Sequence, residues 1–162
     1  MKRFNLHIYH VGVLLAAFLF VSILAAQTGG QSPAVSDVPG ALKLIQPQAL
    51  MKALQSGSER PLVLYVGPHI LYSQAHIRNA EFIGPASGPE GIEKLRKRIT
   101  ALPRNSFIVL YCGCCPWDHC PNIRPAYKEL QKSGFTAVKV LFLAENLGTD
   151  WVNKGYPVEK GP

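Results

Sequence analysis

Short, continuous apolar runs alternate along this chain with segments in which apolar residues recur every three or four positions. The continuous runs predict buried strands over residues 62–66, 107–111 and 137–143. The periodic segments predict helices with one apolar face over residues 47–56, 89–102 and 123–133. Strands that alternate with helices indicate an α/β fold, with a mostly parallel central sheet and helices on both of its faces.

Shorter elements are predicted between these. Residues 41–45 read as an extended entry, residues 69–80 as a loop or short helix, and residues 81–83 as a brief strand. Near the end of the chain, residues 147–153 are predicted to form a last short helix. Residues 155–158 then form a tail that we expect to fold back onto the body.

The N-terminal part has the pattern of an export signal. Lys2 and Arg3 form a short positive region, and an uncharged apolar stretch follows and runs to residue 26. Residues 1–26 are therefore predicted to be a cleaved signal peptide or, alternatively, a membrane anchor. Residues 27–40 have the composition of a flexible linker, and residues 41–162 are predicted to be a single domain. We expect this domain outside the cytoplasm, periplasmic or secreted, or else anchored in the inner membrane of a bacterium.

The composition is that of an ordinary globular protein. Of the 162 residues, 48% are apolar, and the formal net charge is +7. This excess favours small anionic ligands. The densest basic segment, residues 94–98, contains no aromatic residue, so we predict no nucleic-acid partner.

All four cysteines fall between a predicted strand and a predicted helix. Cys112 directly follows the apolar run 107–111, and Cys114, Cys115 and Cys120 lie in the loop that leads to the helix at residue 123. Open α/β sheets bind ligands at the carboxyl ends of their strands, where the amide N–H groups of a helix start can hold an anion. The loop is therefore predicted to be a site of thiolate chemistry.

The order of motifs resembles the rhodanese-like domain over residues 41–161. A strand that ends in Tyr111-Cys112, a helix that closes at residues 130–135, and Trp151 before residues 154–158 are similar to the second half of that family. In the first half, residues 76–80 resemble the family's Gly-His-Ile-Pro-Gly-Ala turn. The resemblance implies a three-layer rhodanese-like fold.

Several family positions carry other residues here. The Asp and Arg that follow the family's early strand fall at Tyr65 and Gly67. The family's loop-closing Arg falls at Asn122, two positions before Arg124. The loop is several residues longer than the family's and holds three additional cysteines.

The resemblance also implies an activity, in which a sulfane sulfur moves from a donor such as thiosulfate to a cysteine persulfide and then to a thiophilic acceptor. The family's catalytic cysteine falls on Cys112. To attack as a thiolate, Cys112 needs a depressed pKa, which we predict from loop amides and the start of the next helix. Arg124 is predicted to bind the anionic oxygens of the donor. The other predicted substrate-binding residues are Gly113, Cys114, Cys115, Trp117 and His119.

Three alternatives remain for the same loop. Cys120 is a candidate resolving thiol, which would make the protein a thiol-disulfide enzyme. The cluster Cys112, Cys114, Cys115, His119 and Cys120 could instead bind a soft metal such as zinc or copper(I). The domain could also be a non-catalytic rhodanese-like module. The main prediction includes no resident metal or cofactor.

Overall fold

The structure is a computed structural model and describes residues 41–57 and 60–161. The predicted N-terminal segment, residues 1–26, and the predicted linker, residues 27–40, lie outside the described residues. Among the residues that are described, no helix has the length and apolar character needed to cross a membrane.

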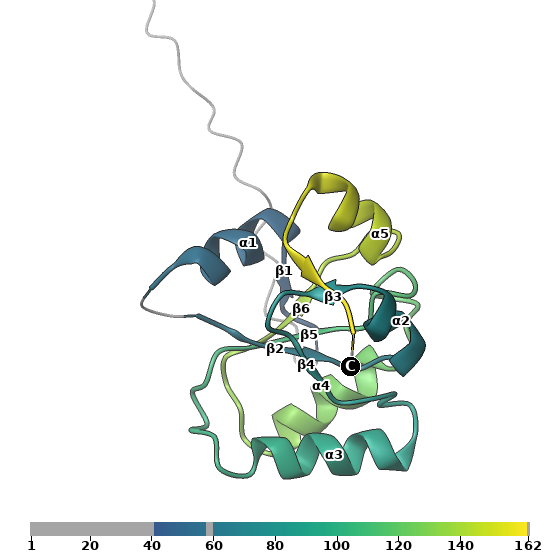
Figure 1. Ribbon diagram of the computed structural model, residues 1–162. Coiled ribbons are helices and arrows are strands. Elements are labelled where there is room, and N and C mark those ends of the chain that lie inside the picture. The colour runs from purple at the N-terminus through teal and green to yellow at the C-terminus, as the bar shows by residue number, and fades with distance from the viewer. Residues whose placement is uncertain (1–40, 58–59, 162) are drawn as a thin grey trace, which may run out of the picture. The chain divides into compact units, whose positions relative to one another are not determined.

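A parallel five-stranded sheet forms the centre of the domain, in the order β1-β6-β5-β2-β4 (Figure 1). Its strands are β1 (Leu44–Ile45), β2 (Leu62–Tyr65), β4 (Glu81–Phe82), β5 (Ile108–Tyr111) and β6 (Val138–Leu141). β5 is the middle strand, paired with β2 in the register Leu64 to Leu110 and with β6 in the register Leu110 to Val140. The continuous apolar runs thus correctly predicted the central strands.

Helices cover both faces of this sheet. They are α1 (Pro47–Gln55), α2 (His69–Gln74), α3 (Pro89–Ile99), α4 (Ile123–Lys132) and α5 (Leu147–Asp150), followed by the 3-10 turn η1 (Val152–Lys154). In Figure 1, α3 and α4 lie on one side of the sheet and α1 and α5 on the other. The predicted three-layer α/β architecture is therefore confirmed.

Alternation along β5 divides the core between the two faces, because successive side chains of a strand point in opposite directions. Ile108, Leu110 and Cys112 belong to the buried cluster that includes α3 and α4. Val109 and Tyr111 belong to the second cluster, which includes α1 and Trp151. The sulfur of Cys112 is thus directed to the side on which α4 begins.

The C-terminal tail folds back, as expected, through a small antiparallel pair. β3 (His76–Ile77) and β7 (Val158–Glu159) pair in the register Ile77 to Val158. The segment 69–80, predicted as a loop or short helix, contains both α2 and β3. The structure also shortens the helix predicted over 89–102, since α3 ends at Ile99 and the next residues form turns.

Candidate active site

Cys112 lies at the carboxyl end of the middle strand and is only 2% exposed. Gly113 follows with φ of 85°, a left-handed conformation that glycine adopts without strain, so the chain can turn sharply at this point. The turn is held against the start of α5, because the Leu147 N–H donates to the Gly113 carbonyl at 3.0 Å. A Cβ at Gly113 would lie 3.1 Å from the Leu147 Cβ. Because Gly113 has no side chain, the loop can begin in close contact with α5.

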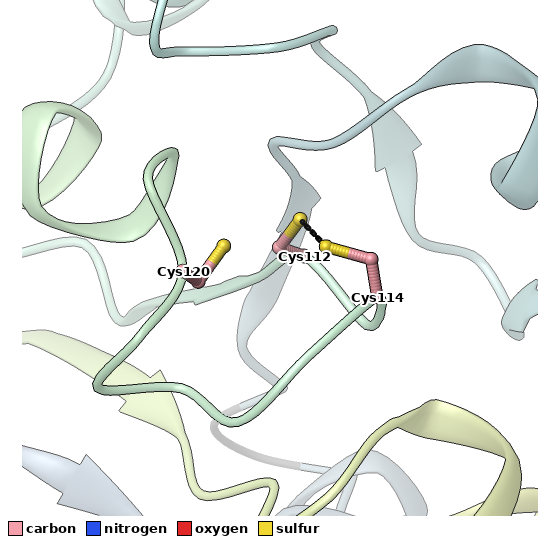
Figure 2. Close-up of side chains that lie close together, drawn as sticks. All are labelled: Cys112, Cys114 and Cys120. Atoms are coloured by element: carbon pink, nitrogen blue, oxygen red, sulfur yellow. Dashed lines mark hydrogen bonds between the residues drawn. The ribbon is translucent and has the colours of Figure 1, made fainter.

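Three sulfurs come together in this loop (Figure 2). The Sγ atoms of Cys112, Cys114 and Cys120 all lie within 4.8 Å of one another, and the Cys112 to Cys114 distance is 3.2 Å. Cys115 lies beside this group, with its Sγ 3.2 Å from that of Cys114. All four are free thiols, and Cys114 is the exposed one. The clustering predicted from the spacing of the cysteines is present.

Asn122 fixes Cys112 from the other side of the loop. Its side-chain amide nitrogen donates to the Cys112 sulfur at 3.4 Å, and its amide oxygen accepts the Ser87 N–H at 2.9 Å. Asn122 is 4% exposed and directly precedes α4. In the sequence, Asn122 stands where the family has its loop-closing arginine, and no role was predicted for it.

The ionised thiol of the cluster is Cys120, and the prediction of a depressed pKa for Cys112 was wrong. The hydrogen bond from Cys112, together with the backbone N–H groups of Asn122 and Ile123, lowers the pKa of Cys120 to about 6. The same hydrogen bond to Cys120, together with burial, raises the pKa of the Cys112 thiol. The first-turn amides of α4 reach Cys120 because it lies only three residues before the helix starts. Cys112 is therefore the proton donor of the pair.

A pocket of about 320 Å³ opens beside Cys112, at the carboxyl edge of the sheet. It is lined by Tyr65, Leu71, Gln74, Ala75, Cys112, Gly113, Cys114, Asn146, Leu147, Gly148 and Val152. None of these lining residues carries a charged side chain. Cys112 and Cys114 are the sulfurs that face the pocket, whereas Cys120 is absent from its lining. A ligand in this pocket therefore meets Cys112 before Cys120.

Tyr65, at the position where the family carries an Asp, forms part of the pocket wall. Its hydroxyl donates to the Pro68 carbonyl at 3.1 Å, and burial together with the nearby cysteine sulfurs raises its pKa. Its ring packs edge-on against Tyr111, with 5.1 Å between the centroids. The neutral hydroxyl of Tyr65 is therefore a fixed part of the wall near the sulfurs.

The remaining predicted substrate-binding residues lie away from this pocket. His119 is 79% exposed, and its Nδ1 is 2.9 Å from the Asp118 carboxylate. Arg124 is exposed on α4, and neither residue is among the pocket-lining residues. Trp117 and Cys115 pack against the core on the α3 and α4 side of the sheet. Of the residues predicted to bind the donor, the structure brings Gly113 and Cys114 to the pocket with Cys112.

Solved structures with this arrangement of elements include a rhodanese-like domain and a thiosulfate sulfurtransferase. A rhodanese-like domain from Anabaena sp. is 24% identical, covers 74% of this chain and 80% of that chain, and gives a TM-score of 0.52. A protein from Bacillus halodurans is 23% identical, with 73% and 77% covered and a TM-score of 0.57. Thiosulfate sulfurtransferase from Pseudomonas aeruginosa is 22% identical, with 75% of this chain but 20% of that chain covered and a TM-score of 0.55.

No family model matches the sequence. No curated protein is significantly similar to it. The likeness to the solved structures nevertheless defines the architecture: the chain has the rhodanese-like fold, as its motifs predicted. At this level of identity the likeness concerns the fold, and the chemistry must be argued from the site.

Proposed function

We propose that the domain is a sulfurtransferase, in which Cys112 takes a sulfane sulfur from a donor such as thiosulfate and passes it to a thiophilic acceptor. The observation that carries the proposal is the position of Cys112, at the end of the middle strand and in the lining of the pocket. Ligands of open parallel sheets bind at this edge. The rhodanese-like fold, which the thiosulfate sulfurtransferase from Pseudomonas aeruginosa shares, supports the same reading.

The first half-reaction transfers one sulfur atom and needs no external oxidant. The Cys112 sulfur attacks the outer sulfur of thiosulfate while its proton passes to the Cys120 thiolate, a new S–S bond forms, and the sulfur–sulfur bond of the donor breaks. Sulfite leaves, Cys112 is left as a persulfide anion, and Cys120 holds the proton. In the second half-reaction, a thiolate or another soft nucleophile attacks the outer sulfur of the persulfide and restores Cys112.

The surroundings of Cys112 suit an intermediate of this kind. The side-chain amide of Asn122 donates to the Cys112 sulfur and keeps it at the strand end. The pocket beside Cys112, lined also by Gly113 and the exposed thiol of Cys114, has a volume of about 320 Å³, which is ample for one additional sulfur atom. Because the lining has no cationic side chain, we expect thiosulfate to bind weakly and less polar persulfide donors to load the protein more readily.

The cellular setting belongs to the same proposal. If residues 1–26 direct export, the domain acts in the bacterial periplasm or outside the cell. Its partners are then a small sulfur donor and a small thiol or protein thiol that accepts the sulfur, and no nucleic acid takes part.

The test is the intact mass of reduced, metal-free protein after incubation with thiosulfate. We expect a gain of one sulfur atom, lost in Cys112→Ser and kept in Cys115→Ser, whose sulfur lies outside the pocket. Circular dichroism spectra of both variants serve as the control that the fold is intact. A loss of two hydrogens without sulfur uptake would instead support a thiol-disulfide enzyme and overturn the proposal.

A further inference from the structure

The three clustered sulfurs have the spacing of a metal-ligand set. Cys112 comes from the end of β5, Cys114 from the loop and Cys120 from the approach to α4, and their Sγ atoms lie within 4.8 Å of one another (Figure 2). Around a metal with metal–sulfur bonds of about 2.3 Å, three thiolates lie about 4 Å apart. The observed triangle fits such a centre once the 3.2 Å contact between Cys112 and Cys114 opens slightly.

We propose that Cys112, Cys114 and Cys120 bind one copper(I) ion as three thiolates. Thiolates are soft ligands and select soft ions, copper(I) and zinc among the common ones. Zinc sites of the structural type are closed by four protein ligands. The described residues place three ligands in the triangle, and a trigonal set of this kind suits copper(I) better than a tetrahedral zinc ion.

Residues around the triangle support bound thiolates. The Asn122 side-chain amide donates to the Cys112 sulfur at 3.4 Å, and Cys120 lies three residues before the start of α4, whose first-turn N–H groups have no intrahelical partner. Hydrogen-bond donors of this kind orient metal ligands and offset their negative charge. Two of the three ligands, Cys112 and Cys120, are buried, while Cys114 is exposed and lines the pocket through which an ion can enter.

Two residues that the sequence grouped with these ligands lie outside the triangle. The His119 ring is exposed and contacts the Asp118 carboxylate. Cys115 contacts Cys114, but its sulfur is not part of the group whose members all lie within 4.8 Å. The structure thus reduces five candidate ligands to three, and this choice makes the proposal testable by substitution.

Copper binding would affect the sulfur chemistry of the same loop. A copper(I) ion held by Cys112 occupies the electron pair with which that sulfur would attack a donor. Copper loading and sulfur loading are then mutually exclusive, and copper would inhibit the sulfurtransferase. The copper proposal itself does not depend on sulfur transfer, because it rests on the positions of the three sulfurs alone.

The experiment is a titration of the reduced full chain with copper(I) in the absence of oxygen, in competition with a chromophoric copper(I) chelator. We expect one copper(I) per chain. Each of the variants Cys112→Ser, Cys114→Ser and Cys120→Ser lacks one ligand. Copper(I) affinity should fall by at least about 100-fold in each, which is the upper end of the effect of losing a residue that only contacts a ligand. Cys115→Ser should weaken binding by no more than about 10-fold, because Cys115 is an outer partner of the ligand Cys114 and not a ligand itself.

The Cys114→Ser variant keeps the test decisive, because an exposed side chain can be replaced without disturbing the core. Copper affinity that is unchanged in Cys114→Ser, or that falls as far in Cys115→Ser as in Cys114→Ser, would overturn the proposed ligand set. Zinc ions that displace copper(I) at equal concentration would overturn the choice of metal. Sulfur uptake is measured separately on copper-free protein, so its failure is distinguishable from a failure of copper binding.

Discussion

The side chain of Asn122 connects the sulfur of Cys112 to the loop before α3. Its amide nitrogen donates to the Cys112 sulfur at 3.4 Å while its amide oxygen accepts the Ser87 N–H at 2.9 Å. The bond to Cys112 is buried, whereas the bond from the Ser87 N–H is partly buried, since Ser87 itself is exposed. One amide therefore positions the reacting sulfur and also satisfies a backbone donor.

Replacing Asn122 should affect both stability and chemistry. Asn122→Ala removes both hydrogen bonds of this side chain, each worth about 0.5–1.5 kcal/mol, so the free energy of unfolding should fall by about 1–3 kcal/mol. Sulfur loading of Cys112 should also become slower, because the sulfur loses the donor that holds it. Denaturant unfolding measures the first effect, and the time course of intact mass measures the second.

Asn105→Ala is the matched control, since Asn105 is exposed in the turn that precedes β5, away from the cysteine loop. Its free energy of unfolding should stay within about 0.5 kcal/mol of the parent value. Equal effects of the two substitutions would show that the bridge made by Asn122 has no special role.

Gly67 is predicted to tolerate no side chain. A Cβ at this position would lie 2.7 Å from both the Cys112 sulfur and the Tyr65 hydroxyl oxygen. Gly67→Ala should lower the free energy of unfolding by about 1–3 kcal/mol through overpacking, and it should slow sulfur loading by displacing Cys112. Gly57→Ala is the control, because a Cβ there meets no atom within 4 Å. A stable, fully reactive Gly67→Ala would contradict the close approach.

The cluster should contain a thiolate at neutral pH, and that thiolate should be Cys120. Its pKa is lowered to about 6, so Cys120 is ionised above this pH and becomes protonated as the pH falls through it. The raised pKa of Cys112 means that this second thiol keeps its proton over the same range. Ultraviolet thiolate absorbance of reduced, metal-free protein should therefore show a transition near pH 6 that Cys120→Ser removes. A transition near the ordinary cysteine pKa alone would be inconsistent with this assignment.

The hydroxyl of Tyr111 should stabilise the fold. It accepts the Ile77 N–H at 3.0 Å in the buried core, linking β5 to the small β3–β7 pair. Tyr111→Phe removes the acceptor and should lower the free energy of unfolding by about 1–3 kcal/mol. Tyr127→Phe should have a smaller effect, because its hydroxyl accepts a longer, partly exposed bond of 3.3 Å from the Lys43 N–H. Thermal or denaturant unfolding compares the two, and equal losses would refute the ranking.

The layers and the position of the cysteine site were predictable from the sequence because the central strands are continuous apolar runs. Residues 62–65 and 108–111 are apolar and, apart from the partly buried Leu62, buried, so their strand character is visible locally. Cys112 directly follows the second of these segments. The pairing of β3 with β7 was not predictable in detail, since each strand has two residues and its partner lies far along the chain. Residues 1–40 are not described, so the export signal stays a prediction.

The protonation of the cluster was the main error of sequence reasoning. Cys112 was expected to accept hydrogen bonds from the backbone amides between β5 and α4. Because the loop is long, Cys120 lies at the start of α4 instead, and these amides lower the pKa of Cys120. The sequence did indicate that Cys120 is the thiol nearest the helix amides, because Cys120 lies three residues before the predicted helix start at Ile123. Spacing alone could not show that Asn122, rather than Arg124, would be directed at the Cys112 sulfur.

The central claim is that Cys112 takes up the sulfur, although its neighbour Cys120 is the more acidic thiol. Tandem mass spectrometry of protein loaded with thiosulfate, trapped by alkylation and digested with trypsin, tests this directly. The informative peptide contains residues 105–128, since Pro125 protects the bond after Arg124. We predict fragment ions that place the added sulfur on Cys112. Added sulfur on Cys114, Cys115 or Cys120, or its absence from this peptide, would contradict the account.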